Sequence, residues 1–171
     1  MRVVGIAGLP GSGKSFVASL FAKRGFRIYT MGDVIREYAK ARGVTPDEAA
    51  VLIRLERGSR AVVAGLGLRR GEGDVVIDGL RSLDEAAAIE EALGSLYLVY
   101  VVASRRTRLM RLMGRGRADD PRSIADFMMR EYRELKFGVA DLLSRADYIL
   151  VNENKAEGDL DAEVESIIRS L

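Results

Sequence analysis

The chain has 171 residues, of which 48% are hydrophobic and 30% charged, and its net charge is +2. This length and composition predict one globular domain spanning 1–171, with a core of its own and no polyanion-binding tail. The sequence contains no cysteine and no histidine, no apolar run approaching the roughly 20 residues of a membrane helix and no secretory pattern, so we expect a cytoplasmic protein without disulfides, thiolate chemistry or imidazole ligands.

The first predicted element is a short buried strand over 3–7, and a glycine-rich segment follows it. That segment fits the phosphate-binding pattern G-x-x-x-x-G-K-[ST] at every fixed position. It consists of Gly8, Leu9, Pro10, Gly11, Ser12, Gly13, Lys14 and Ser15. A helix predicted over 16–23 points its free N–H groups and positive dipole end at a bound phosphate. Lys14 can reach the β- and γ-phosphates, and Ser15 offers a hydroxyl to Mg²⁺. We therefore expect 8–15, the phosphate loop, to bind ATP with Mg²⁺; the alternative is a glycine-rich turn with a solvated lysine.

Strands and helices are predicted to alternate along the rest of the chain. Further strands are expected over 27–31, 74–78, 96–102 and 146–151. Further helices are expected over 34–41, 45–57 with a segment to 68, 82–93, 105–113, from 120–121 onward, and 160–171. In the long helix opened by Asp120-Pro121, one apolar stripe is predicted from Ile124, Phe127, Met128, Leu135, Val139 and Leu142. The alternation predicts an α/β fold, an open parallel sheet with helices on both faces.

Ligands of such sheets bind beyond the carboxyl ends of the strands, where several charged residues are expected. Asp78 ends an apolar strand and is a candidate second support for Mg²⁺, or else a cap for the next turn. Asp33 could accept a hydroxyl proton or orient an acceptor molecule, or it is a plain helix cap. Arg36 and Arg81 are candidates for holding a phosphate on that acceptor, the alternative being surface arginines.

Arginine accounts for most of the basic residues, with 22 Arg against 5 Lys. Six of them fall in one short segment: Arg105, Arg106, Arg108, Arg111, Arg115 and Arg117. Phosphoryl transfer needs cations over the migrating group, and a mobile lid can supply them on closure. Of the six we expect Arg111 and Arg117 to act in this way; the alternative is a solvated helix face paired with acidic residues.

Several segments, in this order, resemble the adenylate kinase and dephospho-CoA kinase branch of P-loop kinases. They are GLPGSGKS, MGDVIR, VVIDGLRS, the arginine-rich segment and ADYILVNE. The resemblance covers essentially the whole chain and is closest to a group of short, mostly archaeal nucleotide kinases. It implies a P-loop fold with strand order 2-3-1-4-5, a helical acceptor-binding insertion near 33–70 and a short arginine lid near 111–123.

The individual motifs imply roles for single residues. MGDVIR is similar to the adenylate kinase segment whose Asp and Arg face the acceptor nucleotide, which implies that role for Asp33 and Arg36. VVIDGLR is similar to that family's DGFPR but lacks its proline. In dephospho-CoA kinases the aspartate at the place of Asp33 is the implied base. The lid here is short and has no zinc-binding cysteine set.

We therefore expect an ATP-dependent small-molecule kinase, a monomer or homodimer, that acts on a nucleotide-like acceptor, with a nucleoside monophosphate favoured. A dephospho-CoA-type hydroxyl acceptor is the alternative within the same class. A regulatory P-loop ATPase or switch acting on nucleic acid is the alternative from another class. Against a GTPase switch, the segment 152–155 is not the N-K-x-D guanine motif, and no aromatic-interleaved basic patch indicates RNA binding.

Overall fold

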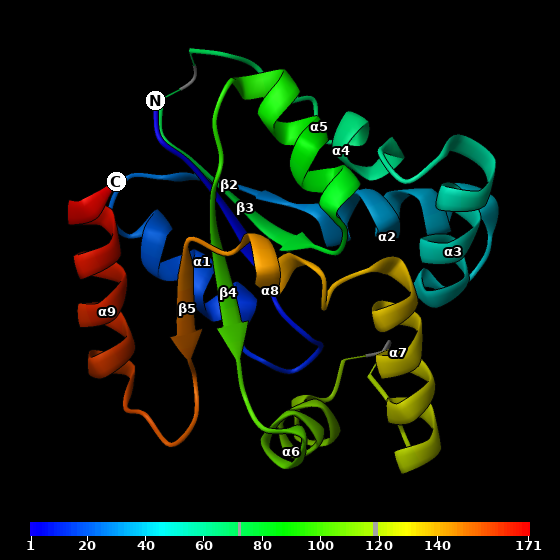
Figure 1. The fold of residues 1–171 in the computed structure, drawn as a ribbon. Helices are drawn as coiled ribbons and strands as arrows, with labels where there is room; N and C mark the ends of the chain where they lie inside the picture. Colours follow the sequence, from blue (N-terminus) through cyan, green and yellow to red (C-terminus); the bar gives the residue numbers. More distant parts are fainter. Residues whose placement is uncertain (72, 118–119) are drawn as a thin grey trace.

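The computed structural model describes residues 1–71, 73–117 and 120–171, and it contains a twisted sheet with helices on both sides (Figure 1). The strands are β1 (Val3–Ala7), β2 (Arg27–Thr30), β3 (Val75–Leu80), β4 (Tyr97–Val102) and β5 (Tyr148–Val151). The helices are α1 (Lys14–Ala22), α2 (Met31–Arg42), α3 (Pro46–Arg57), α4 (Ala61–Gly65), α5 (Leu83–Leu93), α6 (Arg105–Arg115), α7 (Ile124–Phe137), α8 (Leu142–Arg145) and α9 (Glu157–Ser170). Among the described residues, no helix has the length and apolar character needed to span a bilayer.

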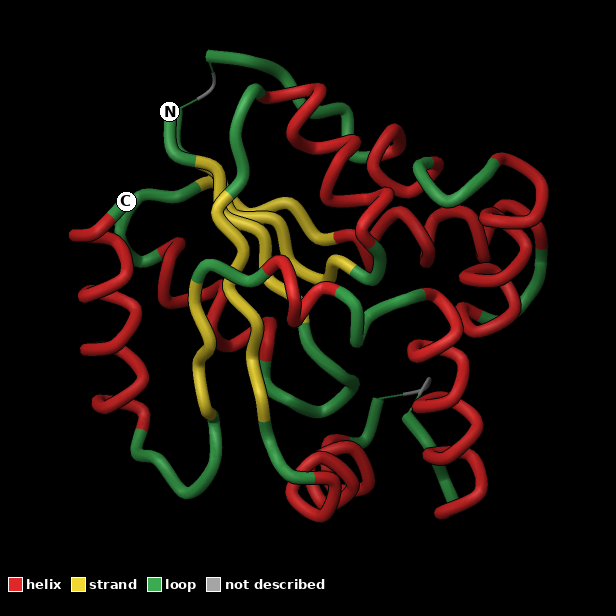
Figure 2. The backbone as a smooth tube through the Cα atoms, in the orientation of Figure 1, coloured by secondary structure: helices red, strands yellow, loops and turns green. Residues whose placement is uncertain are grey.

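The sheet has the order β2-β3-β1-β4-β5 and its neighbouring strands are parallel, as predicted. Figure 2 shows the strands in yellow with helices, in red, around them. The central strand β1 is buried along its whole length, as its uniformly small and apolar sequence indicates. Because all strands run in one direction, their carboxyl ends meet at a single edge. The phosphate loop leaves that edge directly after β1.

Alternate residues of the central strands pack into two separate cores, because successive strand side chains point to opposite faces. Val3 and Val75 belong to the core formed with α2, α3, α4 and α5. Val4 and Val76 belong to the core formed with α1 and α9. Figure 1 shows α9 on one side of the sheet and α2, α3 and α4 on the other. The two layers fix the sheet and therefore the edge that carries the phosphate loop.

The long helix differs from its prediction at its start and in its apolar face. It begins after Ser123, whose hydroxyl accepts the N–H of Asp126 at 3.0 Å, and not at Asp120-Pro121. A serine that caps the helix terminus in this way outweighs the signal of Pro121, two residues earlier. The predicted stripe is also wrong: Ile124, Met128 and Leu135 are exposed, Phe127 is buried, and Val139 and Leu142 lie beyond the end of the helix.

Other boundaries shift by a few residues. β2 ends at Thr30 and α2 follows at once, so Asp33 lies in the first turn of the helix and not ahead of it. β3 continues past Asp78 through Gly79, which adopts φ +102°. The segment predicted to reach 68 is helical only over the short α4, and α8 was not predicted.

Candidate phosphotransfer site

The phosphate loop depends on glycine at three points. Gly8 has φ +145°, and a Cβ on it would lie 2.3 Å from the carbonyl oxygen of Val101. Gly13, the residue before α1, has φ +95°, and a Cβ on it would collide with the side-chain amide of Asn152. Gly11 has φ +82°, and its Cβ would lie 2.6 Å from the carbonyl oxygen of Arg108. No side chain caps α1, so the first N–H groups of this helix remain available to an anion.

The ammonium group of Lys14 lies inside the curve of the phosphate loop. It donates hydrogen bonds to the carbonyl oxygens of Gly8 at 2.8 Å and Leu9 at 3.2 Å. Burial lowers the pKa of Lys14 to about 8, although the carboxylates of Asp78 and Glu134 act in the opposite direction. The charge is thus held in a poorly solvated position, where an arriving phosphate would be its strongest partner.

Ser15 and Asp78 form a pair that suits a divalent cation. The hydroxyl of Ser15 donates to Asp78 Oδ2 at 2.6 Å, and Asp78 is only 5% exposed. Its other oxygen, Oδ1, is buried and has no hydrogen-bond partner among the described residues. Among the described residues, no group of three or more acidic side chains is arranged to hold a metal ion. A serine hydroxyl with one carboxylate and an unsatisfied oxygen fits Mg²⁺, which keeps several waters and takes its remaining ligands from phosphates.

Two cavities are lined by the phosphate loop, and a third shares lining residues with one of them. The central cavity, of about 130 Å³, is lined by Gly8, Pro10, Gly11, Lys14, Ser15, Thr30, Gly32, Arg36, Asp78, Gly79, Arg81, Leu112, Arg115, Arg117, Arg130 and Glu134. A side cavity of about 230 Å³ shares Lys14, Ser15 and Arg117 with it and adds Arg111. Cationic side chains from α2, α6, α7 and the residue after β3 thus line the cavities beside the phosphate loop.

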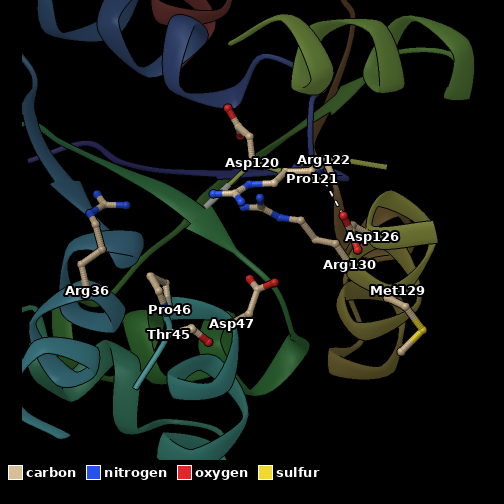
Figure 3. A pocket seen from close by; sticks show the side chains of 10 residues that line it. All are labelled: Arg36, Thr45, Pro46, Asp47, Asp120, Pro121, Arg122, Asp126, Met129 and Arg130. Carbon is tan, nitrogen blue, oxygen red and sulfur yellow. Dashed lines mark hydrogen bonds between the residues drawn. The ribbon is translucent and has the colours of Figure 1, made fainter. Parts of the chain in front are cut away.

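The outer cavity, of about 480 Å³, lies between α2, α3 and α7 (Figure 3). It is lined by Arg36, Thr45, Pro46, Asp47, Asp120, Pro121, Arg122, Asp126, Met129 and Arg130. Arg36 and Arg130 line the central cavity as well, so the two spaces share one wall. In Figure 3 the guanidinium groups of Arg122 and Arg130 extend across the cavity toward the side of Arg36.

The structure brings most of the predicted acceptor residues together. Arg36 and Arg81 both line the central cavity, with Arg81 paired to Glu134 at 3.1 Å between Nε and Oε2. Asp33 lines none of these three cavities; its side chain is 63% exposed and its carboxylate pairs with Arg36 at 2.5 Å. In this conformation the Asp33 carboxylate contacts Arg36, which lines two of the cavities, and does not line a cavity itself.

The two arginines predicted from the arginine-rich segment occupy different places. Arg111 donates to the carbonyl oxygens of Gly11 and Ser12, each at 3.4 Å, and to that of Asn152 at 3.0 Å. It therefore braces the phosphate loop while lining the side cavity. Arg117 lines both the central and the side cavity.

The predicted lid, 111–123, includes 118–119, which lie outside the described residues. Around them, Asp120 holds the chain by accepting hydrogen bonds from Arg115 and from the Arg117 N–H. Burial alone would raise the pKa of Asp120, but these hydrogen bonds outweigh it and lower the pKa. The Asp120 carboxylate therefore holds the residues on both sides of Gly116, Arg115 and Arg117, by hydrogen bonds.

Sequence reasoning missed three residues of the site. Asn152 is buried and its amide donates to the Ser12 carbonyl at 2.8 Å, which ties β5 to the phosphate loop. Its place directly after a strand is the available signal, but neither the resemblance of the segment ADYILVNE nor its mismatch to the guanine motif gives Asn152 itself a role. Glu134 and Arg130, on α7, both line the central cavity. They were missed because that helix was expected to bury an apolar stripe.

Phosphate loop, Ser15–Asp78 pair and converging arginines together define a kinase-like P-loop domain, and the family comparison agrees. Residues 7–127 match the model of a family described as an AAA domain. The fold is similar to that of TT1252 from Thermus thermophilus, with a TM-score of 0.67 and 20% identity over 99% of this chain and 97% of that one. It is also similar to a shikimate kinase from Acinetobacter baumannii solved in complex with shikimate, with a TM-score of 0.64 and 18% identity over 99% and 94%.

Within this class the chain belongs to the UPF0200 family. It is 53% identical over 173 residues to the UPF0200 protein PAE1629 of Pyrobaculum aerophilum, covering 100% of this chain and 99% of that protein. It is 38% identical over 181 residues to the UPF0200 protein TK1334 of Thermococcus kodakarensis, covering 99% and 97%. These names state no activity.

Proposed function

We propose that the protein is an ATP-dependent kinase that transfers the γ-phosphoryl group to a small nucleotide-like acceptor, with a nucleoside monophosphate as the favoured acceptor class. One observation carries the proposal. The phosphate loop opens into the central cavity, which shares Arg36 and Arg130 with an outer cavity large enough for a second small molecule. A site of this form holds a triphosphate on one side and an acceptor on the other.

On the donor side, the N–H groups of 8–15 and the ammonium of Lys14 would hold the β- and γ-phosphates. Ser15 and Asp78 would hold Mg²⁺, since Asp78 Oδ1 lacks any other partner in the described part of the chain. When bound, the cation neutralises charge on the phosphate oxygens. Arg111 and Asn152 contribute by fixing the carbonyl groups of the loop, which keeps its N–H groups aimed at the ligand.

On the acceptor side, Arg36 and Arg81 would grip the acceptor phosphate, and Asp33 would orient Arg36 through their ion pair. Phosphate oxygens are ionised at neutral pH, so transfer to them requires no general base. A hydroxyl acceptor, as in dephospho-CoA, would need a base within hydrogen-bond reach. The exposed position of Asp33 supports the phosphate acceptor over the hydroxyl.

Transfer itself requires positioning and cations at the migrating group. Arg117 is the lid residue proposed for this task, because it lines the central and side cavities together. Arg111 is the second, although its present contacts are to loop carbonyls. The segment 111–123 would close over the substrates and exclude water, which protects the γ-phosphoryl group from hydrolysis.

A regulatory ATPase is the second candidate, supported by the same phosphate loop, and the two differ in their need for an acceptor. The test is a thermal-shift and coupled ADP-release screen across nucleoside monophosphates, dephospho-CoA and nucleosides, with Lys14→Ala as the control. A kinase releases ADP only with its acceptor. Steady hydrolysis that no acceptor stimulates would favour the ATPase and refute the proposal.

A further inference from the structure

Helix α7 places a buried carboxylate inside a cavity whose other charged lining residues are mainly cations. Glu134 is 4% exposed, lines the central cavity and pairs with Arg81. The cationic residues of that lining are Lys14, Arg36, Arg81, Arg115, Arg117 and Arg130, whereas its acidic residues are Asp78 and Glu134. Asp78 is engaged by Ser15. The proposed phosphoryl transfer assigns no role to Glu134.

The position of Glu134 opposes the binding of any anion in this cavity. A buried carboxylate near the phosphate loop repels a triphosphate, and removing it from water is costly unless a cation compensates. Arg81 compensates the carboxylate of Glu134 through their ion pair. Glu134 also acts to raise the pKa of the Lys14 ammonium, so it interacts with that cation as well. The carboxylate therefore balances cations that would otherwise repel one another in a desolvated space.

Arg81 also depends on neighbours for its placement. Its backbone N–H donates to the buried carboxylate of Glu85 at 2.6 Å, and Glu85 is paired with Arg54 of α3 at 2.6 Å. The backbone of Arg81 is thus held by Glu85 of α5, and its guanidinium is held by Glu134 of α7. Removing Glu134 leaves the backbone anchored and releases only the guanidinium.

We propose that Glu134 is a positioning residue and an internal counter-anion. It holds the Arg81 guanidinium at the central cavity until that guanidinium binds a phosphate group in its place. The Glu134 carboxylate thus orients Arg81, and at the same time its negative charge lowers the affinity of the cavity for anions. This inference rests on the proposed function for its effect on turnover, but its effect on anion binding does not depend on any catalytic activity.

The proposal predicts opposite changes in binding and turnover. Glu134→Gln keeps the shape and removes one negative charge, so inorganic tripolyphosphate should bind about five-fold more tightly, as expected for one charge several Å away at a partly solvated site. Turnover with the acceptor should fall about ten-fold, because Arg81 loses its orientation. Glu134→Asp keeps the charge but shortens the reach, so it should restore wild-type tripolyphosphate affinity without restoring turnover.

The experiment is calorimetric titration of tripolyphosphate into the full chain and its variants, together with steady-state kinetics. Glu90→Gln is the matched control. Glu90 lies on α5, pairs with Arg145 of α8 and lines none of the three cavities. This variant changes the net charge equally and should leave tripolyphosphate affinity unchanged. Tighter binding in Glu134→Gln but not in Glu90→Gln supports the proposal.

Unchanged or weaker binding in Glu134→Gln would overturn it, leaving an ion pair that only stabilises the fold. If Glu134→Gln does not fold, the pair Arg81→Gln and Arg81→Gln/Glu134→Gln decides the matter. The double variant should bind tripolyphosphate more tightly than the single one, and equal or weaker binding would overturn the proposal. Absence of turnover in the wild type would refute the proposed function while leaving the binding result interpretable.

Discussion

The pH dependence of ATP binding follows directly from the surroundings of Lys14. Burial inside the phosphate loop lowers the pKa of its ammonium to about 8, and a bound triphosphate would favour the charged form and raise that pKa. Below pH 8 the free protein already carries the proton. Above pH 8 it must take one up in order to bind ATP, so affinity falls as the pH rises.

The size of this effect can be worked out from the pKa. With a value of about 8, roughly three quarters of the free protein is protonated at Lys14 at pH 7.5 and about 3% at pH 9.5. The apparent dissociation constant for ATP should therefore rise about 25-fold over this interval, approaching ten-fold per pH unit at its upper end. The terminal phosphate of ATP adds little, since phosphate groups of this kind titrate near pH 6.

Isothermal titration calorimetry tests this expectation in pairs of buffers with different ionisation enthalpies. At pH 9 the binding of ATP should take up close to one proton. Lys14→Met is the control, and it should bind weakly at every pH, with no uptake attributable to this position. An affinity that stays constant from pH 7.5 to 9.5, without proton uptake, would refute the description of Lys14 as a buried, partly desolvated cation.

Further predictions concern individual contacts of the site. Asp78→Asn should keep the Ser15 hydrogen bond but lower Mg²⁺-dependent turnover on the order of 100-fold, measured as rate against Mg²⁺ concentration; an unchanged rate would remove Asp78 from the cation site. Asn152→Ala should lower the free energy of unfolding by about 1–3 kcal/mol in urea titrations and weaken ATP binding, because the Ser12 carbonyl loses a buried donor. Asp33→Asn should mainly raise the acceptor KM if the acceptor is a phosphate, whereas a loss of kcat of about 10²–10⁴-fold would indicate a base for a hydroxyl. Hydrogen exchange in 111–123 should slow when an ATP analogue and the acceptor are both bound, and unchanged exchange would contradict the lid.

The sequence predicted the architecture well because its strongest signals are local. The phosphate loop is defined by residue types whose backbone conformations and charges are required at fixed spacing, as φ +95° at Gly13 illustrates. The strand order was correct because it came from a resemblance that covers the whole chain. The helices predicted to start at 45 and 82 are confirmed, with the side chains of Thr45 and Ser82 as their N-terminal caps.

What the sequence could not predict depends on contacts between distant segments. Asn152 meets Ser12 across 140 positions, and Glu134 of α7 meets Arg81, the residue that follows β3. The apolar residues of α7 were expected to be buried, but that helix turns its charged face to the central cavity, and Ile124 and Met128 remain exposed. Periodicity identifies a face of a helix, and it does not reveal which face a cavity will use.

The most direct test of the central claim is detection of the phosphorylated product by mass spectrometry. Protein, ATP and Mg²⁺ are incubated with each nucleoside monophosphate, and the acceptor mass is followed alongside ADP. We expect one added phosphoryl group on a nucleoside monophosphate, formed in equal amount to ADP and absent with Lys14→Ala. ADP and inorganic phosphate forming together, with every acceptor mass unchanged, would contradict it.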